Sequence, residues 1–148
     1  MRTNLRIKVA AAVVAMLLGG LLALFATSGP AVAFFSGGLF LDVQVGSPGT
    51  LVARGAAVQV PLEVTCNATP GTAFVEVTVT QKAGSGVARG SAFAEVGCTG
   101  SGQQITVLVQ ASGAKTFKKG DAVAAAVISG CNNVTCGSET DSEVIQLK

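Results

Sequence analysis

The feature that most constrains the fold of this chain is an alternating pattern in residues 58–66. Val58, Val60, Leu62, Val64 and Cys66 occupy every second position, and polar residues or proline lie between them. A period of two is typical of a β-strand with one face in a core and the other in water. The apolar face ends in a cysteine, so we expect this strand to be tied to another one at that point. Covering its apolar face requires further strands, which predicts an all-β domain.

The N-terminal segment has the parts of a secretory signal peptide. Residues 1–8 carry Arg2, Arg6 and Lys8 without an acidic residue, residues 9–26 are apolar, and Ala31-Val32-Ala33 offers a cleavage site. We therefore expect residues 1–33 to be removed on export, and residues 34–148 to form one secreted domain. The alternative is an uncleaved anchor, because about 18 apolar residues can span a bilayer.

The export segment also accounts for the positive charge of the chain. The whole sequence has 10 basic and 8 acidic residues. Three of the basic residues lie within residues 1–8, which leaves seven basic against eight acidic residues after them, a net charge of −1. Composition therefore gives no support for binding to nucleic acid, and we expect no nucleic-acid partner.

All four cysteines, Cys66, Cys98, Cys131 and Cys136, follow the export segment. An even number of cysteines in an oxidising compartment predicts two disulfides. Zinc is the competing interpretation, but the chain has no histidine and no Cys-x-x-Cys pair. We therefore expect no metal site at these cysteines.

Other segments of strand composition accompany residues 58–66. They are residues 39–45, 73–81, 91–98, 104–110, 122–131 and 143–148, and residues 132–138 are expected to form a loop. About seven short strands separated by Gly-rich turns predict an antiparallel, immunoglobulin-like β-sandwich, with a small β-barrel as the alternative. The antibody variant is not supported, because the chain has no Trp and no Tyr.

Strand alternation also predicts the disulfide pairing. If consecutive strands reverse direction, residues 66, 98 and 131 end their strands at the same end of the sandwich, and Cys136 lies in the following loop. We therefore predict the pairs Cys66–Cys98 and Cys131–Cys136.

The layout resembles small secreted Ig-like proteins of actinobacteria, a family without an established function. The resemblance is carried by the strand ending in Cys66, the Phe117-Lys118-Lys119-Gly120 loop, and Cys131 and Cys136. It covers most of residues 34–148. It implies an Ig-like fold and an extracellular location, and it carries no catalytic residues across.

Catalytic chemistry has little support in the sequence. Without histidine, a Ser-His-Asp or Cys-His arrangement cannot form. The Gly-Ser-Gly segments lack the Gly-Lys-Ser/Thr of a phosphate loop. We therefore expect no enzymatic activity and no cofactor.

Three acidic residues, Glu139, Asp141 and Glu143, occupy alternate positions near the C-terminus. Paired carboxylates of this kind can act on glycosides, or can bind calcium together with Asn132 and Asn133. They can also mark a solvated edge strand whose charges discourage aggregation, which is the commoner case and the favoured interpretation.

The same alternation of strands collects the basic residues at the end opposite the cysteines. This set comprises Arg54, Lys82, Arg89, Lys115, Lys118, Lys119 and Lys148. Such an end can dock on an anionic surface, although charged residues also collect in loops without binding anything.

The sequence therefore predicts a secreted or envelope-associated, non-enzymatic binding or structural module. Its partner would be an extracellular or cell-envelope component that the sequence does not identify. The alternative is a secreted inhibitor or small-ligand carrier that presents disulfide-constrained loops.

Overall fold

The computed structural model describes residues 38–68 and 71–148. The expected signal peptide, residues 1–33, lies outside the described residues, as do Phe34 and Phe35. The described part contains no α-helix, and most of it is β-strand. It also has no helix long and apolar enough to cross a membrane.

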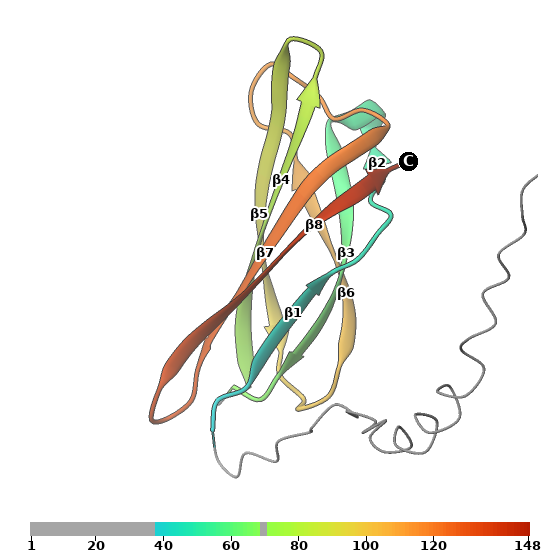
Figure 1. Cartoon of the computed structure of the whole chain (residues 1–148). Helices are drawn as coiled ribbons and strands as arrows, with labels where there is room; N and C mark the ends of the chain where they lie inside the picture. Colours follow the sequence, from blue (N-terminus) through green and yellow to red (C-terminus); the bar gives the residue numbers. More distant parts are fainter. Residues whose placement is uncertain (1–37, 69–70) are drawn as a thin grey trace, which may run out of the picture. The chain divides into compact units, whose positions relative to one another are not determined.

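Eight strands form two antiparallel sheets, as the alternating sequence predicts (Figure 1). Their bounds are β1 Leu41–Val45, β2 Thr50–Val52, β3 Ala57–Cys66, β4 Thr72–Ala83, β5 Gly86–Gly97, β6 Gln103–Gln110, β7 Gly120–Cys131 and β8 Cys136–Leu147, with a short 3-10 turn η2 at Ala53–Gly55. In the first sheet, β3 pairs with β6 on one side and with β1 and β2 on the other. The second sheet has the order β5-β4-β7-β8.

The structure differs from the sequence-based strands mainly near the C-terminus. The last strand was expected over residues 143–148 after a loop at 132–138, but β8 begins at Cys136 and pairs with β7 along its whole length. Residues 137–142 contain no apolar side chain to indicate burial. This part of β8 is a strand because it is hydrogen-bonded to β7. A further short strand, β2, also lies where only a connection was expected.

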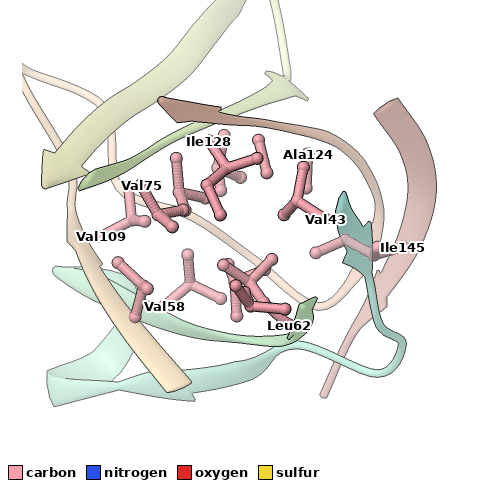
Figure 2. Packing of buried hydrophobic residues seen from close by; sticks show 14 of the residues in the cluster. Val43, Val58, Leu62, Val75, Val109, Ala124, Ile128 and Ile145 are labelled. Carbon is pink, nitrogen blue, oxygen red and sulfur yellow. The ribbon is translucent and has the colours of Figure 1, made fainter. Parts of the chain in front are cut away.

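The core lies between the two sheets (Figure 2). Val58, Val60 and Val64 of β3 have no exposed surface, and neither have Val75 and Val77 of β4. Fully burying a side chain of this size stabilises a fold by about 1.5–3 kcal/mol. The alternating residues of β3 and β4 therefore hold the two sheets face to face.

The end of β8 is tied to the first sheet through residues 49–51. Gly49 N donates a hydrogen bond to Gln146 O at 2.9 Å, and Leu51 N donates one to Lys148 O at 3.0 Å. An added Cβ at Gly49 would lie 2.8 Å from Leu147 Cδ2, so glycine permits this close approach. These contacts fix the position of the C-terminal residue.

Two disulfides join the pairs predicted from strand alternation. Cys66–Cys98, the long disulfide, links residues 32 apart and connects the end of β3 to the residue after β5. Cys131–Cys136, the short disulfide, links residues 5 apart across the ends of β7 and β8. Both bridges lie at the same end of the sandwich, hereafter the disulfide end.

Candidate functional site

The structure brings the predicted basic residues together at the end of the sandwich opposite the disulfide end. This basic end comprises η2, the β4–β5 hairpin, the loop of residues 111–119 and the C-terminus, which lie in the upper part of Figure 1. It contains Arg54, Lys82, Arg89, Lys115, Lys118, Lys119 and Lys148. These are all the basic residues in the described part of the chain.

The loop of residues 111–119 is attached at its start to both sheets. Ala111 N donates a hydrogen bond to Ala56 O at 2.8 Å. Ser112 donates two bonds to Arg89 O, from its backbone N at 2.7 Å and from its Oγ at 3.0 Å. The loop therefore closes the gap between the edge of the second sheet and the start of β3.

Phe117 anchors the middle of the loop. Its side chain is 1% exposed, and its backbone N donates to Gly55 O at 2.9 Å. Gly55 has φ of 87°, and a Cβ there would lie 2.0 Å from Phe117 O. Residue 55 must therefore be glycine, because its φ is positive and because a Cβ would clash with Phe117 O.

Gln81 holds the end of the loop. Its side chain is buried, and its Oε1 accepts a hydrogen bond from Lys118 N at 2.7 Å. Its Nε2 donates to Lys118 O at 2.7 Å and to Asp121 O at 3.2 Å. This clamp fixes the backbone of Lys118, while the Lys118 side chain remains exposed.

The basic side chains themselves face water. All seven are exposed. The Cε atom of Lys115 lies 3.2 Å from the Cβ position of Gly86, so this side chain passes over the β4–β5 hairpin. Arg54 has φ of 59° in the tight turn of η2. The result is a group of exposed cationic side chains on a backbone that is held at several points.

Acidic residues are distributed differently. Asp121 lies at the basic end, where it accepts a hydrogen bond from Gln146 Nε2. The other acidic residues lie further along the strands toward the disulfide end; they are Asp42, Glu63, Glu76, Glu95, Glu139, Asp141 and Glu143. The described residues therefore carry a strong charge asymmetry along the strands, despite a net charge of −1.

The acidic row of β8 belongs to an edge strand. Asp141 Oδ2 accepts a hydrogen bond from Val45 N at 2.7 Å, so this carboxylate binds the free edge of β1. Asn132 Oδ1 accepts bonds from Val134 N at 2.9 Å and Thr135 N at 2.7 Å, and so orders the β7–β8 turn. In the described part of the chain, no three acidic, Cys or His residues are grouped closely enough to hold a metal ion.

Sequence reasoning missed two residues that shape the basic end, Gln81 and Gly55. Gln81 follows Val75, Val77 and Val79 on the buried side of β4. A polar residue at a core position must find hydrogen-bond partners, which is a signal that the sequence contained. The role of Gly55 depends on the approach of Phe117, and no local pattern indicates it.

No protein-family model matches the chain, and no curated protein matches it either.

Proposed function

We propose that this chain is a secreted, non-enzymatic binding module that docks on an anionic surface of the cell envelope through its basic end. The observation that carries the proposal is the location of all basic side chains of the described residues at one end of the two sheets, next to anchored loops. A backbone that is already ordered loses little conformational entropy when it binds. The anchors at Phe117 and Gln81 therefore favour a binding site over a set of freely moving loops.

We also propose that the sandwich is immunoglobulin-like and that it is exported. The chain leaves the first sheet after β3, returns to it with β6 and leaves it again for β7 and β8. Such crossings between two antiparallel sheets support the Ig-like assignment. The charged and apolar order of residues 1–33 and the two disulfides support export.

The strength of docking follows from the number of basic side chains that reach the surface. Each Lys or Arg near an anionic lipid surface contributes about 1 kcal/mol, and the attraction decays within a Debye length of about 10 Å at 0.1 M salt. Removing three contacting charges should therefore weaken binding by about 100-fold.

The test is co-sedimentation of the exported protein, expressed from the full-length sequence in an exporting host, with phosphatidylglycerol vesicles across a salt series. A variant with Lys115→Gln, Lys118→Gln and Lys119→Gln is compared with a charge-matched control at the disulfide end, Ser101→Glu, Asn133→Glu and Ser138→Glu. Both variants lower the net charge by the same amount.

We expect salt-sensitive binding by the wild type and the control, and about 100-fold weaker binding by the lysine variant. The proposal fails if the wild type does not bind at low salt. It also fails if the two variants lose binding equally, because net charge and not the basic end would then control attraction.

A second candidate function is inhibition of an extracellular protease by the β7–β8 turn. The short disulfide closes this turn, Asn132 orders it, and Val134 at its tip is 91% exposed. A rigid, exposed apolar side chain suits insertion into a protease pocket. Inhibition of a panel of secreted proteases that is lost in Val134→Asp would support this candidate, whereas no inhibition by the wild type would reject it.

A further inference from the structure

The outward side of the β5-β4-β7-β8 sheet exposes large apolar side chains. Phe93 is 72% exposed, Val144 64% and Phe74 55%. The outward side of β3 instead presents Gln59 and Glu63, and β6 adds Leu108 as an exposed large apolar residue. Exposed aromatic and branched side chains that gather on one face of a sheet are typical of a protein interface.

The strand registers arrange the outward residues of this sheet in rows that cross all four strands. Along β5 the rows begin with Glu95, Phe93, Ser91 and Arg89. The next strand, β4, continues them with Phe74, Glu76, Thr78 and Thr80. β7 and β8 extend each row by pairing with β4 and with each other. Each row takes the name of its β5 residue.

We propose that a second copy of this chain covers this face and forms a symmetric dimer. The two-fold axis lies in the interface between the Phe93 row and the Ser91 row, and runs across the strands. This symmetry places the Phe93 row of each copy over the Ser91 row of the other. It also places the Glu95 row of each copy over the Arg89 row of the other. This inference does not depend on the proposed docking of the basic end.

Side-chain size supports this register. The Phe93 row has Phe93 on β5 and Val127 on β7, whereas the Ser91 row has Ser91 and Ala125 at the same strands. In the dimer, the larger side chains of one copy therefore meet the smaller ones of the other. On β4, Glu76 of the Phe93 row meets Thr78 of the Ser91 row, whose hydroxyl is a hydrogen-bond donor, and Phe74 of the Glu95 row meets Thr80 of the Arg89 row. Interface cores pack as densely as protein interiors, which requires such a match.

The charged residues of β5 support the same register. Arg89 and Glu95 both point outward on β5 and lie six residues apart, or about 20 Å along the strand. They are too far apart to pair within one chain. The two-fold axis brings Arg89 of each copy to Glu95 of the other, at both ends of the interface.

The size of the face is adequate for a stable dimer. The strands β4, β5, β7 and β8 each have 12 residues. Four such strands cover about 40 Å by about 19 Å, or about 750 Å² per copy. Standard protein interfaces bury about 800 Å² on each partner. A second copy of the same sheet therefore matches the face in size.

The test is sedimentation velocity of the exported protein, expressed from the full-length sequence in an exporting host, over a range of protein concentrations. Detection uses refractive index, because the chain has no Trp and no Tyr. Phe93→Lys is compared with Val134→Lys, which places the same charge on an exposed apolar residue at the β7–β8 turn. A melting curve of each variant, followed by circular dichroism, checks that it remains folded.

We expect the wild type and Val134→Lys to form dimers, and Phe93→Lys to raise the dimer dissociation constant at least about 30-fold. A wild type that stays monomeric at about 0.5 mM, a concentration far above a micromolar dissociation constant, overturns the proposal. So does an equal loss of dimer in the two lysine variants.

A charge exchange tests the register. Arg89→Glu and Glu95→Arg should each weaken the dimer, because each places like charges together across the interface. The double variant restores opposite charges and should recover the wild-type dissociation constant. A double variant as weak as the single variants overturns the proposed axis.

Discussion

Replacing Gln81 with leucine tests whether the clamp on the loop of residues 111–119 holds the basic end in place. Leucine has a similar volume and suits a buried position, so the change removes polar contacts with little loss of packing. Three hydrogen bonds are lost, two with Lys118 and one with Asp121.

The expected cost follows from the number of bonds. A hydrogen bond contributes about 1 kcal/mol net, so three amount to about 3 kcal/mol. The apolar burial gained by leucine offsets part of this cost, which leaves a loss of about 2–3 kcal/mol in the free energy of unfolding. For a domain of this size the melting temperature should fall by about 8–12 °C.

Urea denaturation followed by circular dichroism measures this loss. Gln104→Leu is the matched control, because Gln104 is exposed on β6, and it should change stability by less than about 0.5 kcal/mol. In the Gln81→Leu variant, hydrogen exchange at the Lys118 amide should also accelerate. A Gln81→Leu protein within about 0.5 kcal/mol of the wild type would refute the clamp.

Two further predictions concern the disulfides and η2. Replacing both cysteines of the long disulfide with alanine should cost about 3.7 kcal/mol by loop entropy, and the same change in the short disulfide about 2 kcal/mol, as measured by urea denaturation. Equal losses would contradict the loop-entropy account. Gly55→Ala should destabilise the fold by at least about 2 kcal/mol more than Gly113→Ala, because overpacking against Phe117 adds to the cost of a positive φ. Gly113 has φ of 91° with no atom within 4 Å of an added Cβ, so equal melting temperatures would contradict the contact.

The fold was predictable where one side of a strand is buried. The alternation in residues 58–66 and 73–79 indicates β3 and β4 because their apolar residues face the other sheet. The first half of β8 gives no such signal, since Ser138 and Glu139 face opposite sides and both are exposed. This part of β8 is a strand because it pairs with β7. Strand pairing leaves no mark in the hydrophobic pattern of the sequence.

The location of the basic end was predictable because it follows from counting strand reversals. The details of the site were not, because they depend on contacts between distant segments. Gln81 and Lys118 are 37 residues apart in the chain, and Gly55 meets Phe117 only after both sheets have formed. The apolar outer face was also missed, because Phe74 and Phe93 lie in separate expected strands and come to one face only through the pairing of β4 with β5.

The most direct test of the central claim is to measure which end of the molecule touches an anionic surface. The described residues contain no free cysteine, so Ser85→Cys in the β4–β5 hairpin and Ser101→Cys at the disulfide end each provide one thiol for a donor dye. Both changes are made in the Phe93→Lys variant, because in the proposed dimer residue 101 of one copy would lie beside residue 85 of the other. The two sites are about 40 Å apart along β5. With acceptor lipids in phosphatidylglycerol vesicles, we predict strong, salt-sensitive energy transfer from the dye at residue 85 and weak transfer from the dye at residue 101. Equal transfer from both sites, or stronger transfer from residue 101, would contradict docking through the basic end.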